Sequence, residues 1–105
     1  MGTGVAEVMQ CGHGTTRHCV LRYKDGRRAA MTLNPGTPFC AAVYTTEKAE
    51  TVNTMGDFFP NLLASILDFF AGAETPVPSA ETIEIASVLR AAIDAQKTPD
   101  QWIRL

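Results

Sequence analysis

The stretch "RHCVLRYKDGRRAAMTLN", residues 17–34, decides the fold class, because two runs of strand-forming residues flank a turn. The length of the turn sets the register of the two strands. A two-residue loop places Cys19 opposite Thr32, whereas a three-residue loop ending at Gly26 places Cys19 opposite Met31. The second register pairs apolar with apolar side chains and puts glycine where the backbone needs a positive φ. We therefore expect an antiparallel hairpin with the three-residue loop.

This register also assigns the side chains on the other face of the hairpin. Val20 and Ala30 point away from the face that carries Cys19, because side chains alternate along a strand. Arg22 faces Arg28 across the pair, which is mildly unfavourable unless an acidic group lies nearby.

Further strands are expected on both sides of the hairpin, within residues 4–54, where short runs of β-branched and aromatic residues are separated by turn-forming residues. The expected strands cover Val5–Cys11, Arg17–Lys24, Arg27–Asn34, Phe39–Thr46 and Glu50–Thr54. A last short strand is expected over 101–105, after Pro99.

The second half of the chain has the three-and-four spacing of amphipathic helices. One helix is expected over 57–72, with Asp57 as N-cap and Gly72 as its stop. A second is expected over 79–96, with Ser79 as N-cap. The residues expected on one face of the second helix are Ile83, Ala86, Leu89, Arg90 and Ile93. Ile85, Val88 and Ala92 widen its apolar arc.

These elements predict one α+β domain over residues 1–105, a two-layer structure with a mainly antiparallel sheet of about five to six strands. Both helices are expected on one sheet face, leaving the other face open. The run "FCAAVYTT" is apolar at both parities, so the open face also carries apolar side chains. An uncovered apolar face favours a homo-oligomer. The expected interface residues are Val20, Ala30, Ala42 and Tyr44.

Composition argues against several classes of partner. Nine Lys and Arg against eleven Asp and Glu give a net charge of −2, so a nucleic-acid partner is not expected. No stretch approaches the roughly 20 apolar residues that cross a bilayer, and the first ten residues do not resemble a signal peptide. The three cysteines lie in strand-like segments, which favours reduced thiols and a cytoplasmic protein.

Four potential metal ligands gather near the start of the hairpin: Cys11, His13, His18 and Cys19. Adjacent residues on a strand point to opposite faces, so His18 and Cys19 do not close one tetrahedral site. The same geometry keeps His18 from activating Cys19 as a nucleophile. The glycines of "MGTGVAE" have no strand before them and no helix after them, unlike a dinucleotide loop. We expect no metal, cofactor-binding or catalytic residues.

A helix ending in "LDFFAGAETPVP", then "SAETIEIASVLRAAIDA" and "QWIRL", resembles the C-terminal end of the Gfo/Idh/MocA family of nicotinamide-dependent oxidoreductases. The strand-turn-strand "YKDGRRA" also looks like part of that family's C-terminal sheet. The residues that carry the resemblance are Phe69, Phe70, Gly72, Pro76, Pro78, Glu81, Thr82 and Glu84.

The resemblance implies an open sheet face used for association of subunits. The family's Rossmann domain and its Glu-Lys-Pro segment with the catalytic lysine have no match in these residues. NAD(P) is therefore implied only for a full-length relative, and no cofactor is expected in this chain.

Three functions remain open from the sequence. The first is a non-catalytic structural and oligomerisation domain. The second is a sugar or polyol binding module whose polar patch is formed by His18, Arg22, Tyr23 and Arg28. The third is a subunit that complements an oxidoreductase encoded separately, with a Rossmann-domain chain as its partner.

Overall fold

The computed structural model describes residues 2–12, 14–53 and 56–105. The chain divides into two compact units, where the sequence predicts one domain. The first unit combines Met1–Pro35 with Val77–Leu105, and the second is Gly36–Pro76. The α+β class and the open antiparallel sheet are confirmed.

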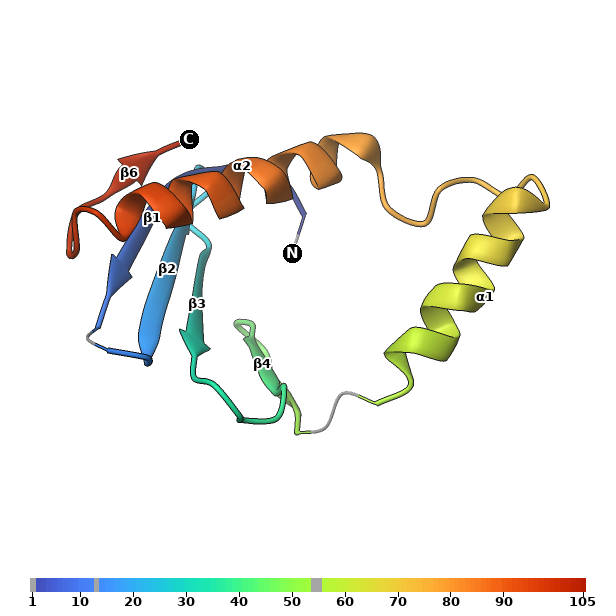
Figure 1. Ribbon diagram of the computed structural model, residues 1–105, viewed down its shortest axis with the longest axis horizontal. Helices are drawn as coiled ribbons and strands as arrows, with labels where there is room; N and C mark the ends of the chain where they lie inside the picture. Colours follow the sequence, from blue (N-terminus) through green and yellow to red (C-terminus); the bar gives the residue numbers. More distant parts are fainter. Residues whose placement is uncertain (1, 13, 54–55) are drawn as a thin grey trace. The chain divides into compact units, whose positions relative to one another are not determined.

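The first unit is an antiparallel sheet of four strands with one helix on it (Figure 1). The strands lie in the order β3-β2-β1-β6, so the first strand of the chain is central and the last is at an edge. They span β1 Val5–Cys11, β2 Arg17–Tyr23, β3 Arg28–Leu33 and β6 Ile103–Arg104. The helix, α2, spans Ser79–Ala95 and packs mainly on β1 and β6.

The core of this unit lies between α2 and one sheet face, which we call the inner face. Val8 and Cys19 are 0% and 1% exposed and sit at its centre. The cluster also contains Val5, Leu21, Tyr23 and Ala91, with Ala29, Val88, Ala92 and Ile103 packed at its margin. Gln10 is buried on the same face, and its Oε1 has no hydrogen-bond partner among the described residues.

The face of α2 that packs on the sheet differs from the predicted one. Ala91 and Ala95 are buried, whereas Ile83, Leu89 and Ile93 are all more than half exposed. Small side chains let the helix backbone approach the strands closely, which the larger aliphatic residues would prevent. Val88 and Ala92 of the expected wider arc do lie at the margin of the core. The predicted central face was wrong because apolar residues occupy most of the circumference of this helix, so spacing alone did not select a face.

The hairpin of β2 and β3 has the predicted register. Leu21 pairs with Ala29 and Cys19 with Met31. The amide of Tyr23 donates to the Arg27 carbonyl at 3.0 Å, which closes a loop of three residues. Gly26 ends this loop with φ +91, the left-handed region that favours glycine.

The second unit contains a two-stranded sheet and one helix. Strands β4 (Ala41–Tyr44) and β5 (Ala49–Val52) form an antiparallel hairpin, and α1 spans Phe58–Phe70. The sequence placed these two strands in the main sheet, but here they form a separate one. None of the residues of α1 is buried.

The predicted N-cap of α1 is confirmed in position, and the predicted N-cap of α2 is wrong by one residue. Asp57 is the N-cap of α1, with φ 56, but its side chain makes no capping hydrogen bond. The N-cap of α2 is Pro78, and Ser79 is the first helical residue. Gly72 follows the end of α1 with a positive φ, as expected of a helix stop. Thr54, the expected end of the fifth strand, lies outside the described residues.

Replacing Gly26 with Ala tests the hairpin. A Cβ at this position would meet nothing within 4 Å, so the cost is backbone strain alone. We expect Gly26→Ala to lower the free energy of unfolding by about 1 kcal/mol. Gly56→Ala is the matched control, because Gly56 is equally open and does not have a positive φ. Equal stability of the two variants in urea unfolding would contradict the strained loop.

Candidate functional site

The most specific long-range contact in the first unit joins the second turn of α2 to the start of β1. The Glu84 carboxylate accepts hydrogen bonds from the amide of Gly4, at 2.7 and 2.9 Å to its two oxygens, and from the amide of Val5 at 2.8 Å. The Gly4 carbonyl accepts a bond from the Lys24 amide at 2.9 Å. Helix, first strand and hairpin turn therefore meet at one point, which we call the Glu84 contact.

These hydrogen bonds lower the pKa of the Glu84 carboxyl below its ordinary value. The bond from Val5 has the largest effect, followed by the bond from Gly4. Partial desolvation acts in the opposite direction, and the positive charges of Lys24 and Arg27 add to the lowering. The carboxylate is therefore ionised at neutral pH and acts as an acceptor.

A shallow groove borders the Glu84 contact, between α2 and the edge formed by β1 and β6. The charged side chains that border it on the side of α2 are Lys24 and Glu84, of opposite sign; Glu7 and Arg104 also border it, but their side chains pair on the other face of the sheet. Ser87 adds a hydroxyl, but this donates to the Ile83 carbonyl of its own helix at 3.0 Å. Since the Glu84 oxygens are engaged by backbone amides, the groove offers a structural contact rather than an acid/base pair.

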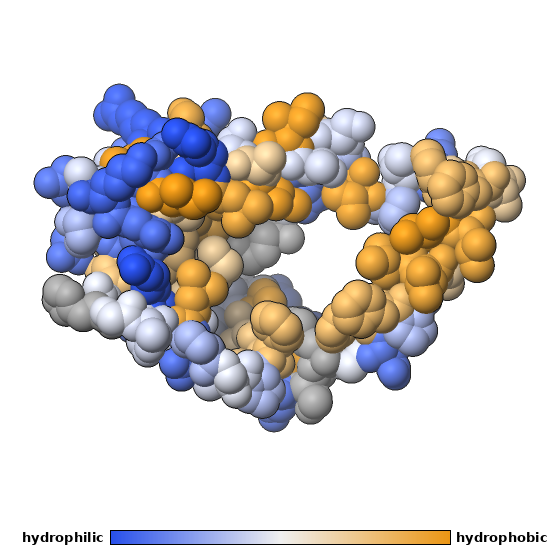
Figure 2. Space-filling view, in the orientation of Figure 1, coloured by the Kyte–Doolittle hydropathy of each residue, from blue (hydrophilic) through white to orange (hydrophobic). Residues whose placement is uncertain are grey.

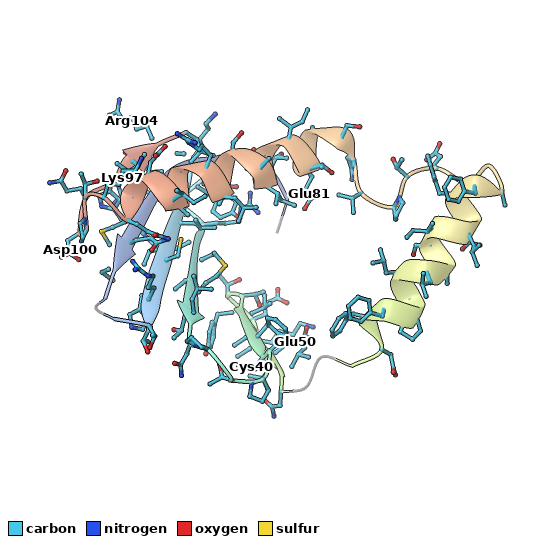
Figure 3. The ribbon with its side chains drawn as sticks, in the orientation of Figure 1. Cys40, Glu50, Glu81, Lys97, Asp100 and Arg104 are labelled. Carbon is cyan, nitrogen blue, oxygen red and sulfur yellow. The ribbon has the colours of Figure 1, made fainter. Side chains whose placement is uncertain are left out.

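A second polar group lies on the outer face of the sheet, opposite to the face covered by α2. Glu7 accepts from Arg22 Nη1 at 2.7 Å and lies 3.6 Å from Arg104 Nε. The Arg22 guanidinium also lies over the Trp102 ring, 4.0 Å from its centroid. Arg104 extends from β6 into solvent (Figure 3). We call Glu7, Arg22, Trp102 and Arg104 the outer-face cluster.

The outer-face cluster supplies a negative charge next to the pair of arginines that face each other between β2 and β3. Arg22 and Arg28 are indeed opposite each other. Glu7 is opposite Arg22 on the other neighbouring strand and supplies the acidic group that such a pair requires. Sequence reasoning missed Glu7, Trp102 and Arg104, because only the pairing of β1 with β6 brings them together.

The four residues of the predicted ligand patch do not form one surface in the structure. Arg22 and Arg28 are neighbours on the outer face, and His18 lies four positions from Arg22 on the same strand, roughly 13 Å away. His18 Nδ1 instead lies 3.2 Å from the Thr32 hydroxyl. Tyr23 is buried on the inner face and shares no surface with the other three.

The predicted interface residues also fall on two surfaces. Val20 and Ala30 are directly paired on the outer face of the four-stranded sheet. Ala42 and Tyr44 belong to β4 in the second unit, where they pair with Thr51 and Ala49.

Neither metal binding nor thiol catalysis has support among the described residues. They contain no group of three or more His, Cys, Asp or Glu that could hold a metal ion. His13 lies outside them. Burial, with the nearby Cys11 as a lesser cause, raises the pKa of the Cys19 thiol, which keeps it protonated at neutral pH. Nor does any described helix have the length and apolar composition that a membrane span needs.

Comparisons of this chain with protein-family models, with curated proteins and with solved structures find no match.

The Glu84 contact predicts a particular pH dependence of stability. Because the folded-state pKa lies below the unfolded value, its contribution is complete above about pH 4.3 and is lost as the pH falls through the folded-state pKa. We expect Glu84→Gln to be less stable than the wild type at pH 7, with the difference shrinking toward pH 3. Thermal unfolding across this range measures it.

The control for this variant is Glu81→Gln, since Glu81 lies one turn earlier in α2 (Figure 3) and takes no part in the Glu84 contact. The control should differ little from the wild type in its pH dependence. A loss in Glu84→Gln that is the same at pH 3 and pH 7 would contradict the assigned role of the carboxylate charge.

The cysteines should differ in reactivity in the order of their exposure. Cys40 is exposed, Cys11 is half-buried and Cys19 is buried. We expect iodoacetamide at neutral pH to alkylate Cys40 first, and Cys19 only when the first unit opens. Peptide mass spectrometry gives the order. Modification of Cys19 as fast as Cys40 would show that the inner face is not closed.

Proposed function

We propose that this chain is a non-catalytic structural domain that self-associates through the outer face of its four-stranded sheet. The observation that supports it most is an apolar row across three strands of that face. Met9 is paired with Val20, and Val20 in turn with Ala30. In the described part of the first unit, no element packs over this row, since α2 lies on the inner face.

The charges on the outer face fit an interface with a polar margin. The outer-face cluster lies on one side of the apolar row, and His18 and Thr32 lie on the other side. An apolar centre with a charged and hydrogen-bonding margin is the usual composition of a protein interface. A two-fold contact would place the same row of both copies face to face.

Under this proposal, any redox reaction would be carried out by residues of another polypeptide segment. The resemblance to the C-terminal part of Gfo/Idh/MocA enzymes supports a role beside a Rossmann domain, which would supply NAD(P) binding and the catalytic lysine. The described residues of this chain contribute scaffold and contact surface, consistent with the engaged state of Glu84 and the protonated Cys19.

Ala30→Lys tests the proposed interface. Ala30 is exposed beside Arg28 and Thr32, so the sheet itself should tolerate the change. The new charge would oppose the arginines of a second copy and would remove apolar contact area. We expect self-association to weaken at least about tenfold, measured as molar mass against concentration by light scattering.

The matched control is Ala73→Lys, which makes the same change at an exposed position after α1. It should associate as the wild type does. A wild-type chain that is monomeric at high concentration, or an Ala30→Lys chain with unchanged association, would exclude the outer face as the interface.

A further inference from the structure

We propose that α1 pairs with the α1 of a second copy of this chain, in an antiparallel arrangement about a two-fold axis. This surface is separate from the outer sheet face, so the inference goes beyond the function proposed above. It depends on the exposed area of the helix, on the order of its apolar residues, and on where its charges lie.

The exposed apolar area of α1 is close to the area that one side of a stable dimer buries. Figure 2 shows apolar side chains gathered over this helix. Six of them form its apolar face: Phe59, Leu62, Leu63, Ile66, Leu67 and Phe70. Their exposures range from 39% for Ile66 to 79% for Phe70. At about 200 Å² for each fully exposed side chain, the face presents roughly 700 Å². A standard interface buries about 800 Å² per partner.

The order of these residues is nearly the same in both directions along the helix. In an antiparallel pair centred between Ala64 and Ser65, Phe59 of one copy meets Phe70 of the other. Leu62 then meets Leu67, and Leu63 meets Ile66. Each contact occurs twice, as a two-fold interface requires. A partner of different sequence would not need this symmetry.

The apolar face of α1 carries no charged residue, so two identical faces can pack together without burying a charge. Asp68 is the single charged residue of the helix, two positions after Ile66 and therefore on the opposite side. Asn61 and Ala64 lie on that side as well. The helix contains neither Lys nor Arg, which does not fit an anionic lipid surface. Two copies can approach without like-charge repulsion.

The test exchanges charges across the expected register. The Ala30→Lys background removes association through the outer sheet face, so that the two proposals are measured separately. In this background we expect a dimer by light scattering. Adding Leu63→Glu or Ile66→Lys should weaken the dimer at least about a hundredfold, because each homodimer then holds two unpaired charges against apolar side chains.

Mixing the two variants should restore the dimer. In the heterodimer the new glutamate meets the new lysine, while the remaining Leu63 and Ile66 still meet each other. Leu63→Glu mixed with Phe59→Lys is the register control and should not recover, because residue 59 faces residue 70. Ala64→Glu, on the polar side of the helix, should dimerise normally. Circular dichroism checks that the helix content is unchanged, as expected when no residue of α1 is buried.

Three results would overturn the inference. An Ala30→Lys chain that is monomeric would show that α1 is covered within its own chain or by a different protein. Unchanged association of Leu63→Glu would place the contact elsewhere. Equal recovery in both mixtures would exclude the antiparallel register. The function proposed above would stand in each case if Ala30→Lys alone weakens association relative to Ala73→Lys.

Discussion

The first unit depends on one carboxylate that connects segments far apart in the chain. Glu84 binds the amides that open β1, and β1 is the strand on which both β2 and β6 pair. Without an acceptor there, the Gly4 and Val5 amides would need other partners at the end of a central strand. The contact also fixes α2 along the sheet, so that Ala91 packs in one cluster with Val8 and Cys19. Packing and polar contact thus specify the same placement of the helix.

Sequence reasoning succeeded where the determinants are local and failed where they are distant. The hairpin register followed from the position of Gly26 and from the need to pair Cys19 with an apolar residue, both within one short stretch. The element boundaries were also close, because turn residues and helical spacing are local signals. The outer-face cluster could not be predicted, since Glu7 and Trp102 meet only through the pairing of β1 with β6.

The choice of helix face shows a different limit. Apolar residues surround most of α2, and their spacing favoured the face that contains Ile83, Leu89 and Ile93 as the buried one. The structure buries alanines instead and exposes Ile83 and Leu89. In α1 the apolar spacing is regular, yet none of its residues is buried in the described structure. Amphipathic spacing predicts that a face must be buried, but it does not identify the surface that buries it.

The interleaved order of the units has a consequence for how the protein is made. The first unit closes only when Val8 pairs with Ile103, so a ribosome must synthesise the whole second unit before that pairing can form. The β2–β3 hairpin can form early, because its contacts are local. During the interval, α1 and the inner face of β1 and β2 are both in water, which is the condition under which nascent chains aggregate or bind chaperones. The rate of translation through residues 36–102 therefore sets how long this chain needs protection.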